Sequence, residues 1–269
     1  MITVDFSAAR CKIRSQNSFF YLGQVIKAMK CLIIAAGRGK RLQEKGTSKP
    51  LVQLAGKPLI EHVISGAQAA GADDFYIVVG HEAERLKQFL GELAGLLGIP
   101  ITIIHNYRWS QGENGASVLT AKDYFHEPFL LLMSDILFDQ GLVRKLLSTT
   151  LQDGEVAATV DDDLKSPWVD LDDFTGAWLE GGKIKDFGNH IPVWNGFVTG
   201  QFYCTPAIFN AIEQTMDRGD SSLAGALRHM ALQGFTKPVM VGGHFWIDVD
   251  DPPSYAKAEQ AMPLRTSNT

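Results

Sequence analysis

The chain has 269 residues, of which 45% are hydrophobic and 20% charged, a composition typical of globular proteins. Its 25 Lys and Arg residues are outnumbered by 30 Asp and Glu residues, so the net charge of −5 predicts no nucleic-acid partner and no attraction to an anionic membrane. The three cysteines lack the paired spacings of zinc or redox sites. No apolar run approaches the roughly 18 residues of a membrane helix. We therefore expect a cytoplasmic protein with reduced thiols and no membrane insertion.

Buried strands and amphipathic helices alternate along the first two thirds of the chain. The predicted strands cover residues 30–36, 75–79, 101–104, 129–133 and 156–160, and the predicted helices cover 58–70, 82–97, 115–124 and 141–147. This order predicts a Rossmann-like α/β fold: a mostly parallel sheet with helices on both faces and ligands beyond the carboxyl ends of its strands. From about Pro167, turn-rich aromatic segments predict a small antiparallel region, interrupted by helices near 206–216 and 221–232.

The two ends of the chain lack these patterns. Residues 1–28 show no clear hydrophobic period, and Met29 stands directly before the first predicted strand. We interpret 1–28 as an N-terminal extension or a mis-set start and give them no functional weight. Residues 29–262 are expected to form a single domain, and 263–269 a frayed tail.

A glycine-rich loop, Ala35 to Leu42, follows the first predicted strand. Gly37 and Gly39 let a backbone approach a phosphate closely, and Arg38, Lys40 and Arg41 supply positive charge. A tight turn with solvated basic residues would also explain this pattern. A dinucleotide-binding loop would need a glycine where Leu42 stands and an acid where Gly80 stands, and no segment has the spacing of a Walker-type loop. Both common nucleotide loops are therefore disfavoured.

The glycine loop is followed by Ser48-Lys49-Pro50-Leu51 and by a short apolar, hairpin-like stretch over residues 52–59. The combination of strand, G-x-G-x-R loop and Lys-Pro resembles the sugar-phosphate nucleotidyltransferase superfamily. The resemblance implies a loop that wraps the nucleotide triphosphate through Ala35, Ala36, Gly37 and Gly39. It also implies that Lys49 stabilises charge on the α-phosphate and that Arg41 holds the leaving pyrophosphate.

Acidic residues stand at the ends of two further predicted strands. Asp135 follows Phe-Leu-Leu-Leu-Met-Ser, where an acid is costly unless it caps a helix or holds a cation. In Trp-Ile-Asp-Val-Asp, Asp248 and Asp250 share one face of a short strand, although Asp250 would also serve as a helix cap. In the superfamily, an acid after the fourth strand and an acid in a W-x-D motif hold magnesium together. The resemblance therefore implies Asp135 and Asp248 as Mg²⁺ ligands.

Residues 111–122 read Gln-Gly-Glu-Asn-Gly-Ala-Ser-Val-Leu-Thr-Ala-Lys, which resembles the loop of CTP:L-myo-inositol-1-phosphate cytidylyltransferases. The likeness covers roughly residues 30–262. It implies transfer from CTP to a phosphate monoester, with L-myo-inositol 1-phosphate as the first choice, giving a CDP-alcohol and pyrophosphate. The base would be read by Asn114, Gly115 and Ser117, and a bulky residue at Gly115 is expected to impair CTP use without lowering stability.

The acceptor side departs most from this family. Phe174-Thr175-Gly176, Phe187-Gly188-Asn189 and Val198-Thr199-Gly200 stand where the family motifs have Ala-Thr-Lys, Ile-Gly-Lys and Asp-Thr-Gly, so two lysines that could meet the acceptor phosphate are absent. Three residues remain as expected acceptor contacts: Asp161, Thr199 and Gly200. The acids around Asp161 would equally form a solvated turn.

Three other interpretations stay open from the residues alone. One is the same chemistry with phosphocholine as acceptor. Another is a hexose 1-phosphate that reacts with UTP, dTTP or GTP. The third is a non-catalytic module that binds nucleotides for regulation. The nucleotide that is consumed would distinguish among them.

Overall fold

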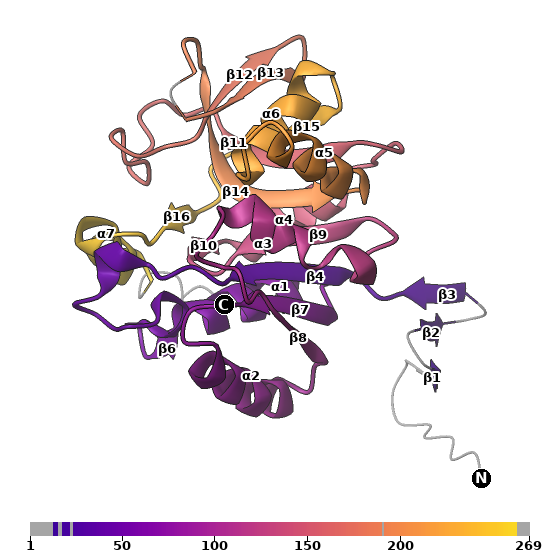
Figure 1. Ribbon diagram of the computed structural model, residues 1–269, viewed down its shortest axis with the longest axis vertical. Helices are drawn as coiled ribbons and strands as arrows, with labels where there is room; N and C mark the ends of the chain where they lie inside the picture. The colour runs from indigo at the N-terminus through magenta and orange to yellow at the C-terminus, as the bar shows by residue number, and fades with distance from the viewer. Residues whose placement is uncertain (1–12, 16–17, 22–23, 190, 263–269) are drawn as a thin grey trace.

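A parallel four-stranded unit forms the centre of the computed structural model, which describes residues 13–15, 18–21, 24–189 and 191–262. The strand β4 (Lys30–Ala35) lies between β7 (Asp74–Val79) and β9 (Phe129–Met133), and β7 pairs in turn with β8 (Ile101–His105). All three pairings are parallel. The predicted α/β fold with a parallel sheet is therefore confirmed (Figure 1).

Beyond β9 the same sheet becomes mainly antiparallel. This part comprises β11 (Val156–Asp161), β12 (Gly176–Glu180), β13 (Lys183–Gly188), β14 (Gly196–Cys204) and β15 (Thr236–Met240). The long strand β14 pairs antiparallel with β9, β11 and β12, whereas β11 and β15 are parallel to each other. The antiparallel region expected from the aromatic, turn-rich sequence is thus an extension of the main sheet.

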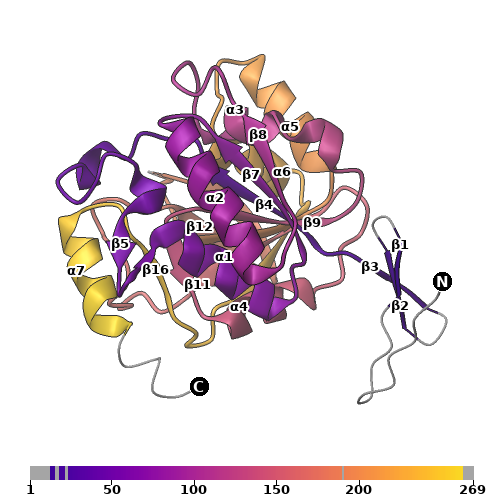
Figure 2. The same cartoon turned by 90° about the horizontal axis from the view of Figure 1, so that it is seen from below.

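Helices cover both faces of the sheet. On one face lie α1 (Leu59–Ala70), α2 (Ala83–Leu97), α4 (Gln140–Leu147) and α7 (Pro252–Ala261), and on the other α3 (Asn114–Leu119), α5 (Ala207–Met216) and α6 (Leu223–Leu232) (Figure 2). Strand β4 shows why. Its residues Cys31 and Ile33 belong to the hydrophobic core under α1, α2, α4 and α7, whereas Leu32 and Ile34 belong to the core under α3, α5 and α6. Successive side chains of a strand point to opposite faces, so a continuous apolar run is buried on both sides.

Short elements complete the structure. They are the strands β5 (Gln53–Leu54), β6 (Lys57–Pro58), β10 (Ile136–Phe138) and β16 (Trp246–Asp248), and the 3₁₀ turns η1 (Lys40–Leu42), η2 (Lys49–Leu51) and η3 (Lys122–Tyr124). Strands β5 and β6 form the hairpin expected at 52–59. The helix expected over 115–124 is shorter, because its chain tightens into the 3₁₀ turn η3 after Leu119.

A separate three-stranded antiparallel sheet precedes β4. It consists of β1 (Ile13–Ser15), β2 (Ser18–Tyr21) and β3 (Gln24–Lys27), and its strands pair with one another. The sequence predicted no element in this region, because its short strands carry no clear period. The tail expected at 263–269 lies outside the described residues. Among the helices that the structure describes, none is long and apolar enough to cross a membrane.

Candidate active site

The pairing of two short strands brings Asp135 and Asp248 together. Asp135 lies between β9 and β10, and β10 runs antiparallel to β16 with Ile136 opposite Asp248. The amide of Val249 donates to the carbonyl oxygen of Asp135 at 3.0 Å and extends this pairing by one bond. The two carboxylates predicted as metal ligands therefore share one site at the carboxyl end of the parallel strands, although they are far apart in sequence.

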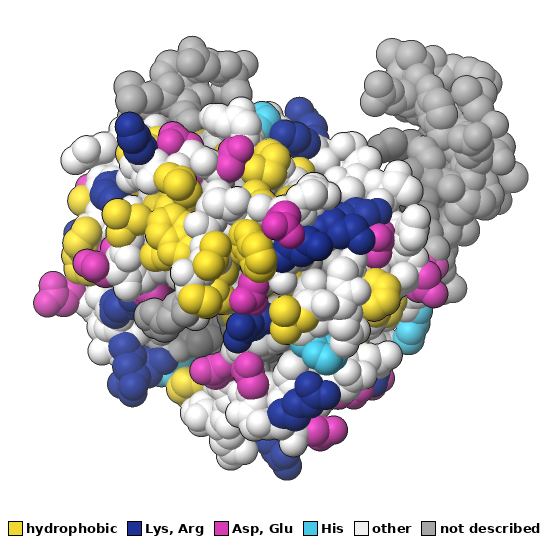
Figure 3. All heavy atoms as spheres, turned by 90° about the horizontal axis from the view of Figure 1, so that it is seen from above, with side chains coloured by type: hydrophobic (Ala, Val, Ile, Leu, Met, Phe, Trp, Pro, Cys, Tyr) yellow, Lys and Arg dark blue, Asp and Glu magenta, His cyan; other side chains and the backbone are white. Residues whose placement is uncertain are grey.

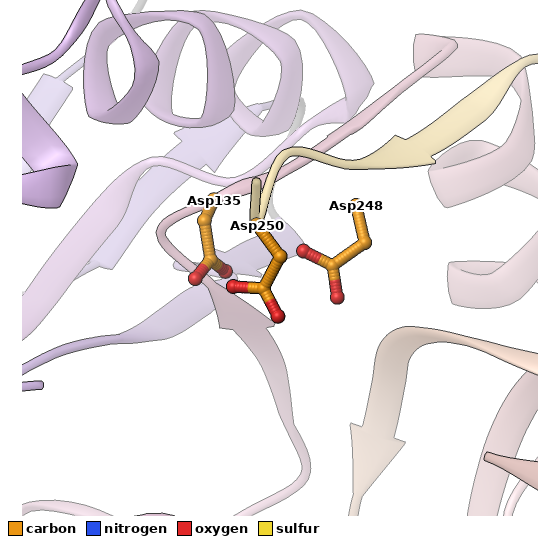
Figure 4. A group of neighbouring side chains, drawn as sticks. All are labelled: Asp135, Asp248 and Asp250. Atoms are coloured by element: carbon orange, nitrogen blue, oxygen red, sulfur yellow. The ribbon is translucent and has the colours of Figure 1, made fainter. Parts of the chain in front are cut away.

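Asp250 is the third carboxylate of this site. Ligand oxygens of Asp135, Asp248 and Asp250 lie within 4.8 Å of one another, and the three side chains point toward a common space (Figure 4). The sequence left open that Asp250 caps the following helix. That role belongs to Asp251, whose side chain accepts from the amide of Ser254 at 2.8 Å within a capping box. The carboxylate of Asp250 is therefore available to the site.

The environment of Asp248 is unfavourable for a lone charge. Its buried Oδ1 has no hydrogen-bond partner within the described part of the chain. Burial, together with the neighbouring charges of Asp135 and Asp250, raises the pKa of Asp248 well above its usual value. A divalent cation would relieve both the burial cost and the repulsion, and carboxylate oxygens are the ligands that Mg²⁺ prefers. The donor set of the three acids therefore fits this metal.

Lys49 supplies a buried positive charge beside the three acids. It begins η2, its side chain is 5% exposed, and its Nζ lies 2.6 Å from Oδ2 of Asp135 and also pairs with Asp250. Burial alone would lower the pKa of Lys49, but the charges of the three carboxylates raise it above its usual value. The lysine therefore stays protonated.

Gly39 makes room for Lys49. Its backbone has φ of 60°, in the left-handed region that favours glycine, and a Cβ there would lie 2.3 Å from Cβ of Lys49. A Cβ at Gly37, in contrast, would meet no atom within 4 Å. The second glycine of the loop is thus required by packing, whereas the backbone at Gly37 is open to a ligand. Ala35 and Ala36 lie buried at the end of β4, as expected for the start of the loop.

Arg41 joins the glycine loop to two distant segments. Its guanidinium pairs with Asp173 and with Asp250. The hydrogen bond to Asp173 and the charges nearby raise the pKa of Arg41, so it remains a cation. Sequence reasoning missed Asp173, because no local pattern connects two residues 132 positions apart. Arg41 and Lys49 both lie beside the carboxylate site, and their roles toward the phosphates stay predictions.

The loop expected to read the base is partly engaged in internal contacts. Oδ1 of Asn114 accepts from the amide of Leu223 at 2.9 Å, and the buried Oγ of Ser117 accepts from Nδ2 of Asn106 at 3.0 Å. A Cβ at Gly115 would lie 2.6 Å from the carbonyl oxygen of Ser221. Gly115 and Ser117 therefore have internal contacts that also serve packing. Base reading by Asn114, Gly115 and Ser117 stays a prediction, and of the three Asn114 lines the cavity described next.

One cavity of about 520 Å³ extends from the carboxylate site to the antiparallel strands and α6. Asp248, Asp250 and Arg41 line one end of it. Val198, Gly200 and Phe202 of β14 and Leu223 and Leu227 of α6 line the other. The cavity thus joins the charged site to the region expected to hold the acceptor.

The three expected acceptor contacts lie differently around this cavity. Gly200 lines it. Thr199 is fully buried and is not among the described residues that line the cavity, and its hydroxyl is hydrogen-bonded to Thr159 and Gln201. Asp161 is buried and accepts from the indole nitrogen of Trp246 at 2.8 Å. The side-chain oxygens of Thr199 and Asp161 are thus engaged in internal hydrogen bonds, whereas Gly200 lies at the cavity. Of the three, we carry Gly200 forward as an acceptor-side residue.

Comparisons with known proteins place this architecture in a family. Residues 31–235 match the model of the MobA-like NTP transferase domain. A bifunctional IPC transferase and DIPP synthase of Rubrobacter xylanophilus is 30% identical over 235 residues, which are 86% of this chain and 51% of the relative. A UTP–glucose-1-phosphate uridylyltransferase of Haloferax volcanii is 27% identical over 249 residues, or 89% of this chain and 98% of the relative.

Solved structures have the same fold. The inositol-1-phosphate CTP transferase from T. maritima superimposes with a TM-score of 0.75 at 21% identity, covering 87% of this chain and 97% of that protein. A UDP-glucose pyrophosphorylase complexed with UDP-glucose gives a TM-score of 0.71, also at 21% identity, covering 88% of this chain and 99% of that one. The chain spans about half the length of the bifunctional relatives, 51% in R. xylanophilus and 44% in Archaeoglobus fulgidus.

Proposed function

The chain belongs to the family of MobA-like NTP transferase domains, and on that premise we propose that it is a magnesium-dependent cytidylyltransferase acting on a phosphate monoester. The observation that carries the proposal is the convergence of Asp135, Asp248 and Asp250 with Lys49 and Arg41 at one end of the cavity. The products would be a CDP-alcohol and pyrophosphate. The relatives that act on inositol phosphates make L-myo-inositol 1-phosphate the first acceptor to test.

The reaction needs positioning and charge compensation more than it needs a base. An oxygen of the acceptor phosphate, already an anion, attacks the α-phosphorus of CTP in line. One P–O bond forms, the bond to the β-phosphate oxygen breaks, and pyrophosphate leaves with the electron pair. Because no proton has to be removed from the nucleophile, a strong general base is unnecessary.

The roles proposed for the charged residues follow from their places. The ammonium of Lys49, held beside Asp135, would stabilise charge that develops on the α-phosphate. The planar fork of Arg41 would turn from Asp173 and Asp250 to hold the pyrophosphate. Asp135, Asp248 and Asp250 would hold Mg²⁺, which when bound supplies Lewis-acid chemistry at the phosphates. The open backbone at Gly37 would approach the triphosphate.

Pyrophosphate release tests the proposal directly. The purified chain is mixed with Mg²⁺, one of CTP, UTP, dTTP, GTP or ATP, and a panel of phosphate monoesters that includes L-myo-inositol 1-phosphate. We expect release with CTP, at a rate about tenfold or more above that with UTP, because a buried polar group left unpaired by the wrong base costs ~1–3 kcal/mol.

The choice of nucleotide decides between this proposal and its rivals. Preferred use of UTP would favour the chemistry named for the Haloferax volcanii relative, and preferred use of a purine nucleotide would remove the cytidylyltransferase assignment. No release with any nucleotide and acceptor, from a folded protein, would point to the non-catalytic nucleotide-binding module.

A further inference from the structure

The acceptor end of the cavity is bounded by an apolar surface. We call it the acceptor wall; its residues are Phe174, Phe187, Phe197, Val198 and Phe202, all of which line the cavity. Phe174 and Phe197 pack edge to face with ring centroids 5.2 Å apart, and Trp194 lies 5.0 Å from Phe174 on the same cluster. Phe174, which is partly exposed, thus packs against the buried Phe197.

The chain has no lysine at position 176, where the family motif has one, and a side chain there would be crowded. At Gly176, which begins β12, an added Cβ would lie 3.2 Å from Cβ of Trp194 and 3.3 Å from Cγ1 of Ile191. The hydroxyl of Thr175, a polar group of this region, already donates to Oδ1 of Asn189 at 2.8 Å. Within the described residues that line the cavity, the cations are Arg41 and Lys257, and Arg41 is paired with two carboxylates.

Carboxylates outnumber these cations around the cavity. Six acids line it: Asp170, Asp172, Asp173, Asp248, Asp250 and Asp251. Asp170 and Asp172 are exposed at the cavity and form no ion pair with a lysine or arginine among the described residues. Bound Mg²⁺ would compensate charge at Asp248, but Asp170 and Asp172 are not among its expected ligands. The cavity therefore combines uncompensated negative charge with aromatic lining residues.

The end of the molecule that carries β12 and β13 has a related character. Figure 3, which looks onto this end, shows hydrophobic side chains gathered over part of the face with acidic and basic groups beside them. Leu171, which precedes β12, and Val193, which follows β13, are 63% and 54% exposed. The apolar surface thus continues in the loops that flank the acceptor wall.

These features discriminate between classes of acceptor. The hydroxyl groups of a polyol could donate to the carboxylates that line the cavity, but a neutral polyol would not compensate their negative charge. An ammonium group is attracted by aromatic faces and by carboxylates together. We propose that the acceptor is a phosphate monoester whose far end carries an ammonium group, held between the acceptor wall and Asp170 and Asp172.

This inference rests on the proposed cytidylyl transfer. It differs in the acceptor, which would be the phosphate ester of an amino alcohol instead of L-myo-inositol 1-phosphate. Four probes test it in the pyrophosphate assay with CTP and Mg²⁺: phosphocholine, phosphoethanolamine, 3,3-dimethylbutyl phosphate and L-myo-inositol 1-phosphate. The third probe has the shape of phosphocholine with carbon in place of the charged nitrogen. We expect kcat/KM for the better of the two amine esters to exceed that for the neutral ester by about tenfold.

The panel separates the two proposals. Turnover of L-myo-inositol 1-phosphate at or above the rate for both amine esters overturns the ammonium proposal and leaves cytidylyl transfer intact. Equal use of phosphocholine and its neutral isostere also overturns it, because shape alone would then select the acceptor. Failure of every ester with every nucleotide overturns both. Whichever amine ester is preferred identifies the ammonium group as quaternary or primary.

Two variants locate the ammonium group. Phe174→Leu keeps apolar volume but removes a ring, and Asp172→Asn keeps shape but removes a charge. Each should raise KM for the preferred amine ester by about fivefold and leave KM for CTP and for the neutral ester within about twofold. Asp162→Asn, which removes an exposed acid outside the cavity lining, is the matched control and should change neither KM. Equal effects on charged and neutral esters would show a merely structural role.

Discussion

The two ends of the cavity are built in opposite ways. At the phosphate end, which comprises Arg41, Lys49, Asp135, Asp248 and Asp250, distant segments meet through ion pairs and leave a buried carboxylate oxygen unpartnered. At the acceptor wall, packed aromatic side chains occupy the space. Phosphates and a metal require particular charges, so the residue types of the first end are restricted by chemistry. The wall has to match the shape and charge of one molecule, and it is there that the sequence departs from the family it resembles.

The largest expected effect comes from the phosphate end. Asp135→Asn and Asp248→Asn should each reduce kcat more than tenfold at saturating Mg²⁺, because a ligand and a full charge are lost while shape is kept. Asp248→Asn should also melt at or above the wild-type temperature, since it removes a buried carboxylate that Asp135 and Asp250 repel and whose Oδ1 has no hydrogen-bond partner among the described residues. Pyrophosphate assays and thermal melting measure the two effects.

Asp162→Asn serves as the control for the loss of one negative charge. If either active-site variant keeps more than about a tenth of wild-type kcat, a loss below ~1.4 kcal/mol, the carboxylate is not a metal ligand. The contrast between the two ends of the cavity would then fail, because the phosphate end would tolerate substitution of its charged residues.

The two glycines of the loop give the next largest effect and separate packing from ligand contact. Gly39→Ala should lower the free energy of unfolding by about 1–3 kcal/mol, because φ at this position is positive and the added Cβ would collide with Lys49. It should also lower kcat/KM, because the collision displaces Lys49 from the acids. Gly37→Ala should melt like wild type, since the added Cβ meets no protein atom. Any defect of Gly37→Ala should appear as a raised KM for CTP. Destabilisation by both variants would contradict this division.

An effect of similar size on stability alone is expected at Gly115, in the loop predicted to read the base. The sequence predicted that a bulky residue at Gly115 would impair CTP use alone. Because its Cβ would lie 2.6 Å from the backbone oxygen of Ser221, Gly115→Ala should instead lower the free energy of unfolding by about 1–3 kcal/mol. At Gly112, a Cβ would meet Cβ of Ala116 at 3.0 Å, so Gly112→Ala should cost less. Urea titration compares the unfolding midpoints of Gly115→Ala and Gly112→Ala. Equal midpoints would contradict the packing role of Gly115.

The smallest effect concerns the support of the acceptor wall. Arg228 of α6 binds Asp186 of β13 through two hydrogen bonds, of 2.7 and 3.1 Å. Burial alone would raise the pKa of Asp186, but the bonds from Arg228 and from the Phe187 amide lower it. The pair therefore contributes its full stabilisation when the pH is above the pKa of an aspartate in the unfolded chain. This contribution is lost as the pH falls through the lower pKa that Asp186 has in the folded protein.

Asp186→Asn should thus cost about 0.5–1 kcal/mol at pH 7, because Arg228 is half exposed and screened by solvent. At pH 3 or below, the difference in urea midpoint between variant and wild type should shrink. A difference that stays constant from pH 7 to acid pH would show that the charge of Asp186 contributes nothing to this support.

The periodicity of the sequence predicted most of the fold. Continuous apolar runs such as residues 30–36 predicted strands buried on both faces, and the structure has them as the parallel centre of the sheet. The two acids in Trp-Ile-Asp-Val-Asp were placed on one face from spacing alone, and Asp248 and Asp250 indeed point into one site. Weak or short patterns failed: three strands within residues 13–27 went unpredicted, and the third helix was drawn too long.

What the sequence by itself determined was therefore local: which segments are strands or helices, and which residue types are suited to phosphate and metal. Only the tertiary structure decided which side chains meet. Arg41 and Asp173 pair across the fold, and the hydroxyl of Thr199 bonds to Thr159 and Gln201 while Gly200 lines the cavity. The physical reason is that a strand shows alternate residues to its two faces, and only its neighbours decide which face borders the ligand.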